Sequence, residues 1–324
     1  MNRTRRSLII AAPSFILTAR TSSAQQRYPD KPIRYIVPVA AGGGADLVAR
    51  TTTTAWGKVL GQSFVVDNQA GGGGVIASQT TARAAPDGYT LLQGYVATHG
   101  TNPATRSVPY DPIKDFTPIG MIGGTPNILV VDPKLPVATL AEFVEYVKKN
   151  TSASYGSAGA GSLTHLTMEL LLAQRGLTMT HVPYKGIAPA FNDFLGGQTQ
   201  AMFPGLTAAL PYIRSNRAKP VAITGGARHP LVPNVPTLDE SGLAGFDAMQ
   251  WYGVVGPAKL PAEIVSVLNT SLAIVLKTPD LAEKLAGEAL QPLPMSPAEF
   301  GAYIRDDIAR WTKLAKERNI KLEA

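Results

Sequence analysis

Two glycine-rich segments contain residue types that bind anions, and the first is Gly42, Gly43 and Gly44. This segment follows an apolar run and precedes a stretch with helical character. The first turn of a helix has backbone N–H groups without intrahelical partners and a partial positive charge, and glycine lets a ligand approach that backbone. The segment therefore predicts a carboxylate or phosphate site, and the alternative is a tight turn that needs a positive φ.

A second strand-to-helix turn of this kind runs from Ser157 to Ser162 and includes Ala158 and Gly159. Ser162 is a natural N-cap, and the Ser157 hydroxyl can point at a ligand. If the two turns lie in two lobes, they can face each other across a cleft and offer N–H donors to the two ends of a ligand. The alternative is two unrelated turns of an α/β protein.

Motifs for catalysis are hard to find in this chain. It has no G-x-S-x-G elbow and no G-x-x-x-x-G-K-[ST] phosphate loop. A dinucleotide fingerprint is incomplete, because Leu47 stands where the third glycine belongs. Asp46 and Asp67 are then more simply a helix cap and a strand-end residue. The four histidines lack the H-E-x-x-H spacing, and they are His99, His165, His181 and His229.

Three further side chains are candidates for the wall of a cleft. His165 lies on the helix that Ser162 opens, so it is either a ligand-binding or basic group near the cleft or a structural histidine. Tyr184 follows a strand and either lines the cleft or belongs to an ordinary turn. Trp251, with Tyr252 beside it, supplies an apolar wall or belongs to the core.

The elements that must position these residues alternate between short apolar runs and helical stretches. This alternation predicts an α/β fold in which helices cover a parallel sheet, and two sheets without a long linker imply more than one crossing between lobes. The expected strands are 32–39, 63–67, 89–92, 127–131, 154–156, 179–182, 200–203, 220–224 and 251–255. The expected helices are 47–60, 74–83, 139–149, 162–174, 189–195 and three that start near 261, 278 and 296.

The N-terminus has the three regions of a secretory signal in order. Three arginines precede residue 7, residues 7–18 are mostly apolar and uncharged, and small residues lead to Ala24. We expect cleavage near Ala24, so that 1–24 is a signal peptide, with a frayed tail as the alternative. Either the ordinary or the twin-arginine export route is compatible with the arginine pair. The apolar run is shorter than the roughly 20 residues of a membrane span.

Charge and composition limit the classes of function. The 324 residues carry a formal net charge of +7, which falls to +3 when the four arginines of residues 1–24 are removed with no acid. Without a basic block, this charge gives no reason to expect nucleic acid as a partner. The lack of cysteine excludes disulfides, thiolate catalysis and cysteine-based zinc sites. We expect no metal, no cofactor and a monomer.

Several segments, taken in order, resemble the Bug family, the receptors of tripartite tricarboxylate transporters. The resemblance extends from residue 28 nearly to the C-terminus, and its order and spacing are specific. The matching segments are YPDKPI at 28–33, PVAAGGGAD at 38–46, APDGYTL at 85–91, 109–112, 114–116, HVPYKG at 181–186, 195–198, 209–211 and PNVPT at 233–237.

The resemblance implies a periplasmic receptor with a type II periplasmic-binding-protein-like fold. Each of its two lobes is expected to be a mainly parallel sheet covered by helices, with the ligand cleft between the lobes and closure by hinge motion. By similarity, residues 25–127 plus 251–324 form lobe 1, and residues 128–250 form lobe 2.

The family holds a ligand carboxylate through backbone groups of the first glycine loop, helped by ordered water and without an arginine clamp. The resemblance and the two turns together predict the ligand-binding residues. They are Ala40, Ala41, Gly42, Gly43, Gly44, Ala45, Asp46, Ala97, Thr98, Ser157, Ala158, Gly159, Ser162, His165, Tyr184, Pro204, Gly205 and Trp251.

One departure from the family pattern bears on the ligand. Many relatives read Met-Phe-Asp-Asn where this chain has Met202-Phe203-Pro204-Gly205. If the acid of the relatives binds an amino group, its loss disfavours an amino-acid ligand, and Pro204-Gly205 leaves a roomier, less polar wall. We therefore predict a non-amino mono- or dicarboxylate, aromatic ones included.

The predicted function is a solute receptor that is not an enzyme and that delivers its carboxylate to the membrane permease subunits of a tripartite tricarboxylate transporter. Two alternatives stay open. One is an exported hydrolase on the same fold, with His165 as base and Ser157 or Ser162 as a participant. The other is a sensor that passes its closed state to a membrane kinase, since fold resemblance does not settle function.

Overall fold

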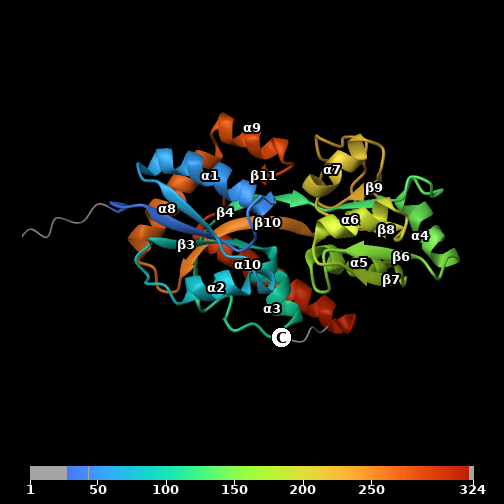
Figure 1. Ribbon diagram of the computed structural model, residues 1–324, viewed down its shortest axis with the longest axis horizontal. Coiled ribbons are helices and arrows are strands. Elements are labelled where there is room, and N and C mark those ends of the chain that lie inside the picture. The colour runs from blue at the N-terminus through green and yellow to red at the C-terminus, as the bar shows by residue number, and fades with distance from the viewer. Residues whose placement is uncertain (1–27, 43, 321–324) are drawn as a thin grey trace, which may run out of the picture.

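The computed structural model describes residues 28–42 and 44–320. The predicted signal peptide, residues 1–24, and Gly43 of the first glycine turn lie outside the described residues. Figure 1 shows two α/β units side by side along the long axis of the molecule, with strands running between them. The predicted α/β class with two sheets is confirmed.

The sheet of the first unit has the strand order β11-β4-β10-β3-β1-β2. In it, β1 pairs in parallel with β2 and β3, whereas β10 pairs antiparallel with β3 and β4, and β11 pairs antiparallel with β4. The strands are β1 (Ile33–Val37), β2 (Phe64–Asn68), β3 (Thr90–Tyr95), β4 (Phe116–Pro126), β10 (Met249–Pro257) and β11 (Gln291–Pro292).

The sheet of the second unit has the order β7-β6-β8-β5-β9. In it, β6 pairs in parallel with β7 and β8, and β5 pairs antiparallel with β8 and β9. The strands are β5 (Ile128–Val131), β6 (Ser154–Ser157), β7 (Thr180–Pro183), β8 (Ala201–Met202) and β9 (Lys219–Ile223).

Both sheets are therefore mixed, although mainly parallel sheets are predicted from the sequence. Strand–helix–strand crossovers keep β1, β2 and β3 parallel. The strands that carry the chain between units run in opposite directions, because β4 leads out to β5 and β10 leads back. They pair antiparallel along most of their length, from Met249 opposite Pro126 to Pro257 opposite Phe116.

Helices cover both sheets, and their expected starts are largely confirmed. Thr139 and Ser296 each accept a hydrogen bond from the backbone N–H of a glutamate three residues on, so both expected capping boxes are present. The first unit holds α1 (Gly44–Leu60), η1 (Gly72–Gly74), α2 (Val75–Ala82), η2 (Ala97–Thr101), α3 (Asn102–Thr105), α8 (Ala262–Leu276), α9 (Pro279–Gly287) and α10 (Pro297–Glu317). The second holds α4 (Leu140–Lys149), α5 (Leu163–Arg175), α6 (Ile187–Leu195) and α7 (Leu206–Arg214).

The core of the first unit fixes the position of α1. Trp56, toward the C-terminal end of this helix, is fully buried, and its Nε1 donates to Ser271 Oγ of α8 at 2.8 Å. Val48 and Ala49 are also buried, so one face of α1 packs along its length. The N-terminal end of α1 is thereby held at the boundary between the units, as Figure 1 shows.

The long strand β4 has no counterpart among the strands expected from the sequence. Its segment contains two prolines and several glycines, which weaken the alternation typical of a strand. The structure supplies the reason for two of these glycines. A Cβ on Gly123 would lie 2.2 Å from Gln291 O, and one on Gly124 would lie 2.3 Å from Met249 Sδ. At Gly123 the backbone of β11 approaches too closely for any side chain, and at Gly124 the Met249 side chain occupies the space.

Within the described part of the chain, no single helix has both the length and the apolar character needed to cross a membrane. Helices α8 and α9 meet those two requirements only when taken together, and they are bent by 74° relative to each other.

Candidate functional site

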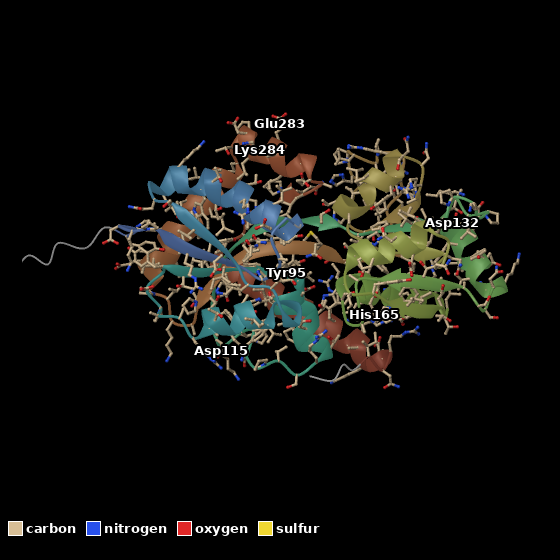
Figure 2. The ribbon with its side chains drawn as sticks, viewed as in Figure 1. Tyr95, Asp115, Asp132, His165, Glu283 and Lys284 are labelled. Atoms are coloured by element: carbon tan, nitrogen blue, oxygen red, sulfur yellow. The ribbon has the colours of Figure 1, made fainter. Side chains whose placement is uncertain are left out.

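A cavity of about 290 Å³ lies between the two units. Figure 2 places Tyr95 and His165 near the middle of the molecule, where the units meet. The first unit and the strands between units contribute Gly44, Ala45, Val48, Tyr95, Thr125, Gln250, Tyr252, Glu288 and Leu290 to its lining. The second unit contributes Ala158, Thr164, Ile187, Gly205, Thr207 and Ala208.

The starts of four helices border this cavity. Gly44 begins α1, Ile187 begins α6, Gly205 is the N-cap of α7, and Thr164 lies in the first turn of α5. For α6 and α7, no side chain of the described residues accepts a hydrogen bond from the first turn. The partial positive charge and N–H donors of these helix starts favour an anion.

Among the described residues, the lining of this cavity includes no cationic side chain. Neither lysine nor arginine occurs among the residues around the cavity, and Glu288 is the carboxylate among them. Tyr95 and Tyr252 stack with ring centroids 6.5 Å apart and planes 10° apart, which makes part of the wall aromatic. The cavity thus suits a small anion with an apolar body, held by backbone dipoles.

The Asp46 side chain stabilises the first glycine turn through hydrogen bonds. Its Oδ2 accepts from Gly42 N at 2.9 Å and Arg50 Nε at 3.0 Å, and its Oδ1 accepts from Asn68 Nδ2 at 2.9 Å. Burial raises the pKa of Asp46, but the hydrogen bonds from Arg50, Gly42 and Asn68 outweigh it, so the pKa lies below its ordinary value. Gln93 Nε2 donates to Ala45 O at 2.8 Å and holds the other side of the turn.

The second turn is held by its own hydrogen bonds. Ser157 Oγ lies 2.7 Å from His181 Nε2 and accepts from Gly159 N at 3.1 Å. Ser162 Oγ donates to Gly159 O at 2.6 Å and caps α5 by accepting from His165 N. Because these groups are engaged, the turn presents Ala158 to the cavity, with the Ser157 side chain fully buried behind it.

The two histidines behind this turn are stacked, with centroids 3.9 Å apart and planes 6° apart. His165 Nδ1 accepts from Gly161 N at 3.0 Å. Burial lowers the pKa of His165, and burial together with the neighbouring His165 lowers the pKa of His181 to about 4. Both rings are therefore neutral at neutral pH, and they support the turn.

Of the predicted ligand-binding residues, Gly44, Ala45, Ala158 and Gly205 line the cavity. Ala40, Ala41 and Gly42 are exposed. Ala97 and Thr98 lie in η2, and Gly159 and Ser162 lie in the second turn. Pro204 is buried and accepts from Ile128 N at 2.8 Å, and Tyr184 donates to Asp193 Oδ2 at 2.8 Å. Trp251 is fully buried and donates to Asp307 Oδ2 at 2.9 Å. The assignment of these residues to ligand binding stays a prediction.

Several lining residues were not predicted from the sequence, among them Tyr95, Thr125 and Gln250, whereas Tyr252 was named only as a neighbour of Trp251. The alternation of side chains along β10 could have separated Tyr252 from Trp251. Adjacent strand residues point to opposite faces, so Trp251 and Tyr252 cannot both face the cavity. No local pattern marks Thr125, because its strand was not recognised.

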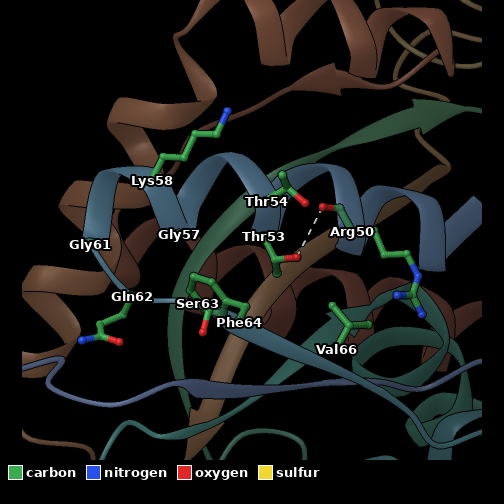
Figure 3. Close-up of a pocket in the computed structure, with 10 residues that line it drawn as sticks. All are labelled: Arg50, Thr53, Thr54, Gly57, Lys58, Gly61, Gln62, Ser63, Phe64 and Val66. Atoms are coloured by element: carbon green, nitrogen blue, oxygen red, sulfur yellow. Dashed lines mark hydrogen bonds between the residues drawn. The ribbon is translucent and has the colours of Figure 1, made fainter.

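A larger hollow of about 670 Å³ lies elsewhere, along the outer side of α1 and the edge strand β2. Figure 3 shows Arg50, Thr53 and Lys58 around it, with Thr53 Oγ1 donating to Arg50 O at 3.4 Å. No helix begins at this hollow, and it is open to solvent. The convergence of helix starts therefore locates the candidate ligand site at the smaller cavity between the units.

Comparison with known proteins agrees with this architecture. Residues 48–320 match the family described as tripartite tricarboxylate transporter family receptor. The chain is 33% identical to protein BugT of Bordetella pertussis over 332 aligned residues that cover all of both chains.

Solved structures are similar over nearly the full length. A protein of R. palustris, Rpa4515 with adipate, is 34% identical with a TM-score of 0.82, over 92% of this chain and 100% of that one. MatC from Rhodopseudomonas palustris with bound malate is 33% identical with a TM-score of 0.77, over 89% of this chain and 99% of that one. These matches confirm the two-lobed fold class and the resemblance inferred from the sequence. The chain belongs to the receptors of the tripartite tricarboxylate transporter family.

Proposed function

We propose that this protein is a periplasmic receptor that captures a small non-amino mono- or dicarboxylate in the cavity between its units. The observation that carries the proposal is the convergence of helix starts from both units on a cavity that, in the described part of the chain, is lined by no lysine or arginine. Adipate and malate in two relatives support a carboxylate ligand. The stacked Tyr95 and Tyr252 make aromatic carboxylates suitable candidates.

We propose that the units correspond to lobes 25–127 plus 251–324 and 128–250, which close on the ligand. Two hydrogen bonds near the segments that connect the units support this division. Asn127 N donates to Thr224 Oγ1 at 2.9 Å, and Thr224 Oγ1 donates to Ala248 O at 2.6 Å. One threonine thus ties both connecting segments, and rotation about this junction would open or close the cavity.

Differential scanning fluorimetry of the exported protein against a carboxylate library tests this function. A ligand that binds the folded state alone, at 100 times its dissociation constant, adds about 2.7 kcal/mol of stability, which gives a clear rise in Tm. We expect carboxylates to raise the Tm and their methyl esters to leave it unchanged. Stabilisation by acidic amino acids alone would overturn the non-amino assignment.

We propose that the protein binds without catalysis, and the geometry of the second turn supports this. His165, the base of the alternative hydrolase, accepts from Gly161 N, and the histidine at Ser157 is His181. The Ser157 hydroxyl is fully buried. Mass spectrometry of the ligand after incubation checks this point: we expect it unchanged, and its conversion would bring back the hydrolase.

We propose that the receptor, a monomer exported with cleavage near Ala24, delivers its ligand to membrane permease subunits. Deletion of its gene is expected to abolish uptake of the labelled carboxylate that the screen identifies. If uptake persists and only a transcriptional response to that carboxylate is lost, the partner is a membrane kinase.

A further inference from the structure

Thr125 and Gln250 form a polar pair on the strands that connect the two units. Thr125 lies on β4 directly opposite Gln250 on the antiparallel strand β10. Residues directly opposite in such a pair point to the same face of the sheet. Both line the cavity between the units, so this face is the one that a bound ligand meets.

The Thr125 hydroxyl is buried without a hydrogen-bond partner among the described residues. Thr125 is 3% exposed, and its Oγ1 has no acceptor or donor within hydrogen-bond reach in this part of the chain. A buried polar atom in this condition costs stability, so most such atoms find a partner. Thr125 lines the cavity between the units, so an atom of a ligand in that cavity is the candidate partner of this hydroxyl.

Gly205 lies beside this pair and has no side chain that would cover it. A Cβ built on Gly205 would lie 3.7 Å from Thr125 Cγ2 and 4.0 Å from Gln250 Cβ. Any longer side chain at Gly205 would therefore extend across the pair. Since Gly205 is also the N-cap of α7, the N–H donors at the start of that helix lie beside the two side chains.

The groups at this place are mainly donors. The start of α7 offers N–H groups, the Thr125 hydroxyl can donate, and the Gln250 amide can donate through its nitrogen. An oxygen atom of a ligand matches them, whereas a methyl group would leave the threonine hydroxyl unpaired. Discrimination by such a buried group is strong because the mismatched ligand leaves it without a partner.

We propose that Thr125, with Gln250 beside it, is the specificity-determining residue for the second end of the ligand. The pair accepts carboxylates whose far end carries an oxygen and rejects those that end in a methyl group. The inference rests on the proposed carboxylate-binding function. The oxygen can belong to a hydroxyl or to a second carboxylate, and the experiment separates these two.

The test uses isothermal titration with two sets of matched probes. The first set is adipate, 6-hydroxyhexanoate and hexanoate, and the second is terephthalate, 4-hydroxybenzoate and 4-methylbenzoate. In each set only the far end differs. We expect the wild-type protein to bind an oxygen-ended probe about tenfold more tightly than its methyl-ended counterpart. If adipate and terephthalate bind more tightly than the hydroxyl-ended probes, the oxygen at the far end belongs to a carboxylate. If the hydroxyl-ended probes bind more tightly, it belongs to a hydroxyl.

The variant Thr125→Val removes the hydroxyl and keeps the shape. We expect it to lower the affinity for oxygen-ended probes about tenfold and to leave methyl-ended probes unchanged. Thr52→Val is the matched control, because Thr52 is also a buried threonine whose Oγ1 lacks a partner among the described residues, and it does not line the cavity. We expect this control to bind all probes as the wild type does.

Two results would contradict the inference while leaving the proposed function in place. One is equal binding of oxygen-ended and methyl-ended probes by the wild type, and the other is an equal loss for all probes in Thr125→Val. Failure of every probe and of the wider carboxylate library to bind the wild type would instead overturn the proposed function, and the inference with it.

Discussion

At the scale of single residues, Gly205 shapes the cavity because it lacks a side chain. Its φ of −62° and ψ of 145° suit any residue, so a substitution there does not strain the backbone. The position is the N-cap of α7, where aspartate and asparagine are favoured over glycine by a few tenths of a kcal/mol. Residue 205 therefore offers a way to change the charge of the cavity without unfolding the helix.

We expect Gly205→Asp to weaken carboxylate binding and to leave the unfolding free energy equal to that of the wild type or about 0.3 kcal/mol higher. The added charge faces Thr125 and Gln250 and repels an anionic ligand. Gly205→Asn is the matched control, since it adds similar bulk without charge. Titration calorimetry and thermal unfolding check both variants; equal loss of binding in the two would mean that bulk and not charge is responsible.

The contribution of Asp46 to the unfolding free energy depends on pH, and its hydrogen bonds set the sign of that dependence. Its pKa in the folded protein is below the ordinary value, so its contribution to stability is present above about pH 4 and is lost as pH falls through the folded pKa. We expect Asp46→Asn to cost about 2 kcal/mol at neutral pH, because the bonds to Gly42 and Arg50 are charge-assisted. Urea unfolding of both proteins should show this difference shrinking below about pH 4.

At the scale of elements, α10 is fastened to the connecting strand β10 by a buried carboxylate. Asp307 on α10 accepts from Trp251 Nε1 at 2.9 Å and lies 3.4 Å from the Arg310 guanidinium, which also contacts Asp247 at 2.7 Å. Burial raises the pKa of Asp307 to about 6 despite these partners. The helix and the strand are thus joined through a group that titrates below neutral pH.

The raised pKa of Asp307 predicts a loss of stability as pH rises. Between the unfolded value of about 4 and the folded value of about 6, the folded protein binds more proton than the unfolded chain, so unfolding free energy falls on going up in pH. We expect this group to account for a change of about 3 kcal/mol across that window. Denaturation curves of Asp307→Asn at several pH values should lack this change in unfolding free energy. An unchanged pH profile in the variant would refute the assignment of the change to Asp307.

The elements also differ in how well the sequence predicted them. Capping boxes and amphipathic stripes are local, so the starts of α4 and α10 were predicted correctly from a few neighbouring residues. Strand β4 was not predicted because the space beside two of its glycines is occupied by Gln291 and Met249. Those contacts join segments that are distant in the chain, and no local window contains them.

At the scale of the whole molecule, further side-chain contacts join the units outside the connecting strands. Arg318 Nε, just after α10, lies 2.7 Å from Glu169 Oε2 on α5, and Glu169 Oε1 accepts from Tyr155 at 2.6 Å. Thr207 of α7 donates to Glu288 O, just after α9. Figure 1 shows α10 extending from the first unit toward the second. These contacts restrain the relative position of the units.

Arg318→Met is expected to loosen this arrangement without disturbing the core. The ion pair is partly exposed, so its loss costs about 1 kcal/mol, which changes the ratio of closed to open molecules about fivefold. Small-angle scattering of the ligand-free variant should give a larger radius of gyration than that of the wild type, and saturating ligand should reverse the increase. Lys313→Met, whose side chain is 79% exposed, serves as the control. Identical curves for all three proteins would show that the pair does not restrain the units.

The sequence by itself determined the α/β class, the positions of the two strand-to-helix turns, most helix starts and the family. These features depend on residues that are close together in the chain, such as the glycines before α1 and the Ser162 cap of α5. Only the tertiary structure decided that Tyr252 and not Trp251 faces the cavity, that His181 meets Ser157, and that Thr125 stands opposite Gln250. Each of those outcomes depends on which strands pair and in which register, and pairing between distant segments is set by packing of the whole fold.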